Sequence, residues 1–252
     1  MYELRLPDDY HVHLRQAPDL PVYARSVAAQ FGRALAMPNT DPPIADPMAL
    51  KHYRKEIMDA TAEVSDVFEP VMTFYIKNGM DHDHVAAMKE AGARAGKLYP
   101  AGATTNSKYG VRRAQDAEAT FRAMEELDLV LCIHGEDPDA HVLDREEAFL
   151  PQLAWIRETC PRLRIVLEHV STRAAIDFVK NADDRMAATI TLHHLVYSLD
   201  DVMGATLNPH LFCKPVIKSP ENRDALRSVI AEPHRRFFFG SDSAPHPLSK
   251  KE

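Results

Sequence analysis

The sequence predicts a (β/α)8 barrel, and three observations lead to this fold class. Short apolar runs with strand character alternate with helical runs along the chain, which indicates a parallel sheet covered by helices. Eight such strands fit within 252 residues, the usual size of a (β/α)8 barrel. The alternative is a doubly wound open sheet, but no Gly-x-Gly-x-x-Gly follows any predicted strand, which counts against its dinucleotide-binding version.

The first half of the chain predicts four strands and four helices. The strands lie within 9–15 and at 33–37, 68–76 and 95–99; the helices lie at 19–30, 46–62, 81–91 and 114–127. The helix at 46–62 begins with Asp46 as its N-cap and Pro47 at its first position, a pattern typical of helix starts. The strand at 33–37 is stopped by Pro38, because the residue before a proline avoids helical conformation and the ring cannot donate a hydrogen bond.

The second half continues the same alternation with one interruption. Strands are predicted at 129–134, 164–169, 187–193 and 236–240, and helices at 144–159, 172–181 and 220–231. An irregular connection separates the strand at 187–193 from the last helix, which Ser219 caps and Pro220 begins. The pattern predicts one barrel domain over residues 1–252.

The end of the chain departs from a complete barrel. Glu252 follows the eighth predicted strand closely, whereas a barrel normally has a helix that covers this strand and the seam with the first. We expect a barrel truncated after its eighth strand, less stable and less active than a longer form; the alternative is that something else covers the seam.

Charge and cysteine content exclude several classes of partner. The chain has 30 basic and 37 acidic residues and a formal charge of −7, without a long basic run, which disfavours nucleic acid and anionic membranes. No apolar run reaches the length of a membrane span. Cys132, Cys160 and Cys213 are odd in number and far apart, which suits a reducing cytoplasm rather than a disulfide framework.

Potential metal ligands stand at the carboxyl ends of several predicted strands. His11 and His13 are two residues apart, so on a strand both imidazoles face the same side. His134, His169 and Asp242 end or follow three other strands, and a barrel brings all these positions to one mouth. Imidazole and carboxylate suit zinc. Five such ligands exceed the need of one catalytic zinc, and two metals with a shared bridge would use them all.

Lys97 is the candidate for the missing bridge. A lysine in an apolar strand is costly when charged, so burial lowers its pKa and leaves a reactive neutral amine. Addition of carbon dioxide would convert this amine to a carbamate, an anion able to bridge two metals. The alternative is an ordinary lysine that reaches solvent or forms an ion pair.

Other histidines are set aside at this stage. His193 and His194 are adjacent at the end of a predicted strand, so at most one faces inward; we interpret His193 as core or supporting and His194 as facing the helices. His210 has no evident partner in the sequence and is expected at the surface.

Six segments together resemble the amidohydrolase superfamily, and more narrowly the dihydroorotases of the bacterial single-function type. They run nearly from end to end of the chain: Asp-Tyr-His-Val-His-Leu-Arg at 9–15, Met-Pro-Asn at 37–39, Gly-Lys-Leu-Tyr-Pro-Ala at 96–101 with Ala-Thr-Thr-Asn at 103–106, His-Gly-Glu at 134–136, Glu-His at 168–169, and Gly-Ser-Asp-Ser-Ala-Pro-His at 240–246. The segment with Lys97 and its Thr-Thr loop is the most specific of them.

The resemblance implies a role for each site residue. His11 and His13 would bind the more buried of two zinc ions, His134 and His169 the second, and N6-carboxylated Lys97 would bridge them. Asp242 would complete the first zinc site and act as general base and acid. The expected substrate contacts are Arg15, Asn39 and His246 on the substrate carboxylate, Thr104 and Thr105 on a loop that closes over the substrate, and His134 and Lys214.

The implied activity is the reversible conversion of dihydroorotate and water to N-carbamoyl-aspartate, a step of pyrimidine synthesis. The resemblance also implies a homodimer that acts on this small molecule. Lys214 departs from the family pattern, because an apolar residue is expected where its backbone meets the substrate ring; the family also continues past residue 252. Two alternatives remain open: another cyclic-amide hydrolase, such as a hydantoinase or allantoinase, and a non-catalytic barrel that partners a pyrimidine enzyme.

Overall fold

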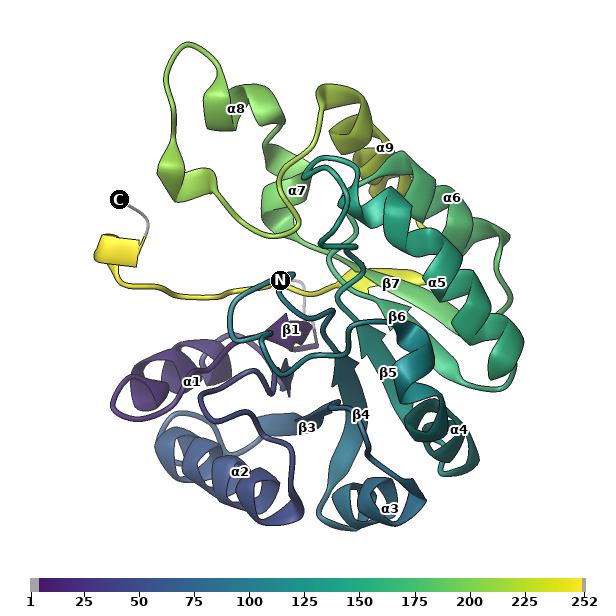
Figure 1. Cartoon of the computed structure of the whole chain (residues 1–252). Coiled ribbons are helices and arrows are strands. Elements are labelled where there is room, and N and C mark those ends of the chain that lie inside the picture. Colours follow the sequence, from purple (N-terminus) through teal and green to yellow (C-terminus); the bar gives the residue numbers. More distant parts are fainter. Residues whose placement is uncertain (1–4, 251–252) are drawn as a thin grey trace.

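Eight parallel strands form one sheet in chain order. Figure 1 shows the computed structural model, which describes residues 5–250. The strands are β1 (Asp8–Val12), β2 (Arg33–Ala36), β3 (Glu69–Tyr75), β4 (Ala93–Leu98), β5 (Val130–Ile133), β6 (Arg164–Leu167), β7 (Met186–Ile190) and β8 (Phe237–Phe239). Each pairs in parallel with the next, from β1 through β8. The predicted order of strands is confirmed.

The sheet curls into a nearly closed barrel where β1 meets the segment that follows β8. Val12 and Ser243 form a parallel bridge. The backbone N–H of Asp242 donates to the carbonyl of His11 at 2.9 Å, and that of His13 donates to the carbonyl of Ser243 at 2.9 Å. The (β/α)8 fold class is therefore confirmed, and the seam lies beside the predicted metal ligands.

Helices cover the outside of the strands in Figure 1. The covering helices are α1 (Leu20–Ala28), α2 (Pro47–Thr61), α3 (His82–Glu90), α4 (Glu118–Glu126), α5 (Arg145–Thr159), α6 (Arg173–Asn181) and α9 (Pro220–Ala231). Shorter turns are η1 (Ala114–Ala117), α7 (Leu192–Val196), α8 (Leu199–Met203), η2 (Pro209–Leu211) and η3 (Leu248–Lys250). In the part of the chain that the structure describes, no helix combines the length and apolar character needed to cross a bilayer.

Two predicted helix starts can be compared with the structure in detail. The side chain of Asp46 accepts hydrogen bonds from the backbone N–H groups of Met48 and Ala49, with Pro47 at the first helical position, so the predicted cap is confirmed. The helix predicted at 114–127 is interrupted: a 3-10 turn precedes α4, because Ala117 leaves helical conformation at φ −115° and ψ 16°.

The strand predicted at 187–193 ends earlier, at Ile190. The side chain of Thr191 accepts a hydrogen bond from the backbone N–H of His194 and so caps the short helix α7. His193 and His194 therefore lie on a helix rather than on a strand, and the predicted opposition of their side chains across the sheet is wrong.

The interior of the barrel is narrow and apolar below its mouth. Leu35, Met37, Ala95 and Cys132 pack there as a buried cluster separate from the larger core between strands and helices. Alternate residues of a strand face the same side, so the next inward positions after Ala95 and Cys132 are Lys97 and His134. This apolar cluster therefore lies directly below the polar residues at the mouth of the barrel.

Candidate metal centre

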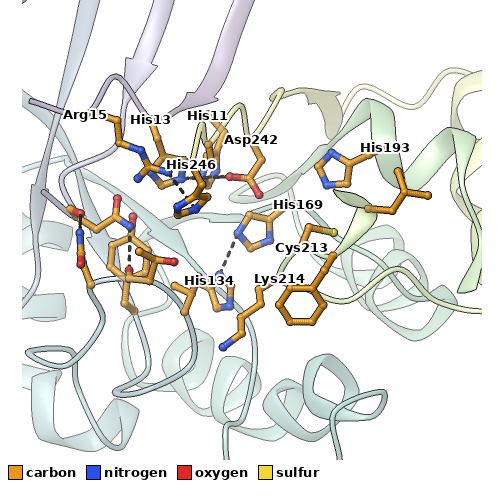
Figure 2. A pocket seen from close by; sticks show the side chains of 18 of the residues that line it. His11, His13, Arg15, His134, His169, His193, Cys213, Lys214, Asp242 and His246 are labelled. Atoms are coloured by element: carbon orange, nitrogen blue, oxygen red, sulfur yellow. Dashed lines mark hydrogen bonds and ion pairs between the residues drawn. The ribbon is translucent and has the colours of Figure 1, made fainter. Parts of the chain in front are cut away.

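The carboxyl ends of the strands surround a cavity of about 650 Å³ (Figure 2). Eleven of the residues predicted as site residues line it: His11, His13, Arg15, Asn39, Thr104, Thr105, His134, His169, Lys214, Asp242 and His246. The twelfth, Lys97, is fully buried with an exposed fraction of 0%. Residues that were predicted at the ends of different strands, far apart in the sequence, thus lie together around one cavity.

The first group of ligand atoms lies at the barrel seam. Nε2 of His11 is 3.3 Å from Nε2 of His13 and 3.4 Å from Oδ1 of Asp242, and the His13 and Asp242 atoms are 3.1 Å apart. Ligand atoms around a tetrahedral zinc, with bonds of about 2.1 Å, lie about 3.4 Å from one another. The spacing of these three atoms therefore fits one zinc ion.

The second group comes from β5 and β6. Nδ1 of His134 lies 3.1 Å from Nε2 of His169, and the two rings meet edge to face with centroids 4.7 Å apart. Figure 2 shows both rings beside the first group, and His169 and His11 have ring centroids 5.0 Å apart. The two groups are therefore neighbours within one polar centre.

The protonation states of these side chains suit a cation. Burial lowers the pKa of His11 and of His169 well below the ordinary value, so both imidazoles are neutral. Burial alone would raise the pKa of Asp242, but its interactions with His11 and His13 outweigh that cost and lower it. Neutral imidazoles beside an ionised carboxylate are a donor set that a divalent metal binds without prior loss of a proton.

Lys97 occupies an unusual position for an amine. Its Nζ lies 3.1 Å from Oε2 of Glu168, and neither side chain is exposed to solvent. Burial lowers the pKa of Lys97 to about 7. The same Oε2 of Glu168 contacts Nδ1 of His11, and Nζ lies 5.3 Å from the centre of the Tyr99 ring, so the amine lies beside the first group of ligands.

Left-handed backbone conformation accompanies the site. Among residues 5–250, five residues other than glycine have positive φ, and four of them line the cavity: Arg15 (59°), Asn106 (55°), His169 (42°) and Asp242 (48°). Such conformations cost about 1–3 kcal/mol each and occur at functional sites. At His169 the effect is direct, because the turn lets both Glu168 and its neighbour His169 face the centre, which a regular strand does not allow.

Residues suited to a carboxylate also line the cavity, with Arg15 and His246 beside the first group in Figure 2. Nη2 of Arg15 is 3.3 Å from Nε2 of His246, and Nε of Arg15 donates to the carbonyl of Pro245. Nδ2 of Asn39 donates to the carbonyl of Thr105, and Nδ2 of Asn106 donates to the carbonyl of Asn39. This reciprocal pair of hydrogen bonds holds the Thr104–Thr105 loop over the cavity.

Lys214 reaches the same loop from the connection between β7 and α9. Its Nζ donates a hydrogen bond to the carbonyl of Ala103 at 2.8 Å. An apolar side chain at this position could not make that contact, so the departure from the family pattern has a structural role in this chain.

Several residues of the site were not assigned by the sequence. Glu136 and Glu168 were quoted only within motifs, yet both are buried beside histidines of the centre. Tyr99 and His193 also line the cavity. The alternation from Val166 to Glu168 along one strand could have placed that glutamate inside the barrel, whereas His193 depends on the helix cap at Thr191.

His193, His194 and Cys213 form another group whose ligand atoms lie within 4.8 Å of one another. Nδ1 of His194 is 2.7 Å from Oγ1 of Thr191, and its Nε2 is 3.0 Å from the carbonyl of Pro215. Nδ1 thus bonds the N-cap residue of α7, and Nε2 bonds the connection before α9. Both ring nitrogens are engaged, and we assign His194 a structural role. His210 is exposed, as predicted, at the rim of the cavity.

Comparison with known proteins identifies the family. No family model matches the chain. A curated relative, the dihydroorotase of Nitrosomonas europaea, is 43% identical over 251 residues, which cover 98% of this chain and 72% of the relative. Many further curated dihydroorotases match at similar identity, including that of Acidovorax sp. at 41% over 249 residues.

Solved structures agree with the sequence comparison. The crystal structure of dihydroorotase from Campylobacter jejuni superposes with a TM-score of 0.89 at 40% identity, covering 96% of this chain and 70% of that one. Dihydroorotase from Saccharomyces cerevisiae, solved with 5-fluoroorotic acid, gives a TM-score of 0.88 at 36% identity, covering 98% and 71%. An L-hydantoinase from Arthrobacter aurescens shares the fold alone, with a TM-score of 0.81 at 15% identity. The chain belongs to the dihydroorotase family of the amidohydrolase superfamily.

Proposed function

We propose that this protein is a dihydroorotase, a hydrolase that interconverts dihydroorotate and N-carbamoyl-aspartate in pyrimidine biosynthesis. The observation that carries the proposal is the arrangement of one cavity. Imidazole and carboxylate ligands lie at its floor, and Arg15, Asn39 and His246 lie on one wall. The substrate presents a ring amide for hydrolysis and a carboxylate for recognition, and the cavity offers a partner for each.

The proposal includes two zinc ions. His11, His13 and Asp242 would hold one, and His134 and His169 the other. Lys97, as a carbamate, would supply the bridging anion. This is supported by its burial and by its position beside Glu168, which contacts His11. When bound, the ions would supply Lewis acidity that activates water near neutral pH and polarises the amide carbonyl.

Asp242 is the proposed proton carrier. Its Oδ1 lies on the side of His11 and His13, which leaves Oδ2 to accept a proton from the attacking water. The same oxygen then returns the proton to the amide nitrogen as the ring opens. In the ring-closing direction the carboxylate works in reverse, so one residue serves both directions.

The remaining residues bind and orient the substrate. The guanidinium of Arg15 suits a planar carboxylate, because parallel N–H groups match its two oxygens. Asn39 and His246 complete this carboxylate site. Thr104 and Thr105 stand on the loop that Asn39 and Asn106 hold over the cavity, where they can contact the substrate and exclude water. His134 and the backbone of Lys214 are further proposed contacts.

The proposed setting is a cytoplasmic homodimer of one-domain barrels. The cytoplasm is supported by the cysteines: all three lie within the described part of the chain, and none forms a disulfide. The dimer follows from the family resemblance, and analytical ultracentrifugation of the zinc-loaded protein tests it.

Substrate turnover tests the function. The purified protein, with zinc added, should hydrolyse dihydroorotate far faster than hydantoin or allantoin, and metal analysis should find two zinc ions per chain. Preference for hydantoin or allantoin would reassign the substrate within the superfamily. A protein that binds no metal and turns over none of the three would instead be a non-catalytic barrel.

A further inference from the structure

Two buried glutamates lie behind the proposed metal ligands, one in each group. Glu136 and Glu168 are each only 1% exposed, and neither has a part in the proposed reaction. We propose that they are positioning residues, which fix the ring nitrogen that His134 and His11 turn toward the metals. This inference rests on the proposed metal site but adds residues to it.

Glu136 determines the orientation of His134. Its Oε2 lies 2.7 Å from Nε2 of His134. An ionised carboxylate only accepts hydrogen bonds, so the imidazole proton sits on Nε2 and the lone pair on Nδ1. That Nδ1 is the atom 3.1 Å from Nε2 of His169. Glu136 therefore directs the less usual of the two ring nitrogens into the centre.

Glu168 acts on His11 in the opposite sense. Its Oε2 contacts Nδ1 of His11. A carboxylate at that nitrogen favours the tautomer with the proton on Nδ1 and the lone pair on Nε2. Nε2 is the atom that converges with His13 and Asp242. The two histidines thus offer different ring nitrogens to the metals, and in each case a glutamate lies at the nitrogen that is turned away.

The backbone position of each glutamate explains why it contacts one particular histidine. Glu136 follows His134 by two residues just after β5 ends, and its backbone N–H donates to the carbonyl of His134 at 3.1 Å, a tight turn that keeps the two residues together. Glu168 is the inward residue next to His169, whose positive φ lets both face the centre. Carboxylates that hydrogen bond to metal-ligating histidines fix the tautomer and raise ligand basicity, and their loss costs about 10–100-fold in metal affinity.

The test measures metal affinity rather than turnover. Glu136→Ala and Glu168→Ala are titrated with Co2+ in competition with a chelator, and the visible spectrum of bound Co2+ reports ligand geometry. Each variant should bind one ion about 10–100-fold more weakly than the unchanged protein, with an altered spectrum. Glu136→Gln and Glu168→Gln keep an acceptor oxygen and should recover part of the affinity.

Glu146→Gln is the matched control. Glu146 is also buried, but its carboxylate accepts hydrogen bonds from Ser171 and Thr172 and contacts no histidine. Its removal should lower the melting temperature and leave Co2+ affinity and spectrum unchanged. If an alanine variant does not fold, the glutamine variant carries the comparison.

The outcomes separate this inference from the proposed function. If the unchanged protein binds two Co2+ ions and all four variants match it in affinity and spectrum, the positioning role is wrong while the metal site stands. Equal weakening by Glu146→Gln would also overturn it, because the effect would then belong to any buried carboxylate. Failure of the unchanged protein to bind metal would contradict the proposed function itself.

Discussion

Lys97 has the environment that differs most from that of an ordinary lysine. It is fully buried at the floor of the cavity, with Nζ 3.1 Å from a buried glutamate. Because burial lowers its pKa to about 7, the amine is charged below that pH and becomes neutral above it. Only the neutral form has the lone pair that carbon dioxide addition needs.

Replacement of Lys97 tests its proposed bridging role. Lys97→Ala should lose the paired metal site and nearly all turnover, since the proposed bridging carbamate can no longer form. Short carboxylic acids such as acetate should restore part of both, because they supply the missing carboxylate. Metal analysis and turnover with and without acetate measure this. A metal-loaded unchanged protein whose intact mass and structure show an unmodified lysine would contradict the prediction.

Asp242→Asn tests the proton carrier. General acid–base catalysis contributes about 10²–10⁴-fold, so turnover should fall by at least that range while binding of a carboxylate-bearing substrate analogue persists. Metal content must be measured in the same sample, because Asp242 is also a proposed ligand. Near-normal turnover by the variant would reject the assignment.

The two-residue alternation of strands predicts some of the inward-facing site residues. The others depend on a left-handed backbone conformation that the alternation does not predict. Lys97 and His134 follow the inward positions Ala95 and Cys132, so the two-residue period was enough to place them. Glu168 and His169 are neighbours that both face inward, and this depends on φ of 42° at His169. Positive φ is most common at glycine and asparagine. A histidine at this position therefore gives no sign in the sequence of a left-handed conformation.

At the scale of elements, the loop at 100–110 is held from two sides. The side chain of Asn39 donates to the carbonyl of Thr105, and that of Asn106 donates to the carbonyl of Asn39. Lys214 donates to the carbonyl of Ala103 from the connection after β7. The resemblance implied a loop that carries Thr104 and Thr105, but it did not indicate the residues that hold this loop. The same connection begins at Thr191. Its side chain caps α7 there, so β7 ends at Ile190 and not at 193 as the sequence predicted.

Removal of the Lys214 contact should loosen this loop. Lys214→Leu loses a hydrogen bond from a charged donor, worth at most about 1.5–3 kcal/mol when buried and less at this half-buried position. We therefore expect KM for dihydroorotate to rise by several-fold, with faster protease cleavage within 100–110. Lys51→Leu, on the exposed face of α2, is the control for loss of a positive charge. Equal KM and equal cleavage rates in both variants would show that the Lys214 hydrogen bond does not stabilise the loop at 100–110.

At the scale of the whole molecule, the order of the strands was predictable and the seam was not. The spacing of apolar residues within each strand and each helix can be recognised from the local sequence. The seam depends on contacts between residues far apart: Ser241 donates its backbone N–H to Oδ1 of Asp9, and Asp242 donates to the carbonyl of His11. The first ligand group lies directly on this seam, so metal binding and barrel closure involve the same residues.

Removal of metal should therefore destabilise the fold. A ligand that binds only the native state at 100 times its dissociation constant adds about 2.7 kcal/mol, and about 1 kcal/mol shifts the melting temperature by roughly 2–4 °C in a protein of this size. Zinc-loaded protein should melt several degrees above chelator-treated protein. Hydrogen exchange should rise most in β1 and β8 after chelation. A uniform change across all strands would indicate that the seam has no special dependence on metal.

The position of the ligands at the seam also has a mechanical meaning. His13 and Asp242 are 229 positions apart in the sequence and 3.1 Å apart in space. A pulling force applied near the two ends of the chain would load β1 and the segment after β8 before it loaded β2 to β7. Metal coordination by His13 and Asp242 would bear this force first. When it breaks, the seam would open and β8 would separate from the barrel while β2 to β7 stayed paired.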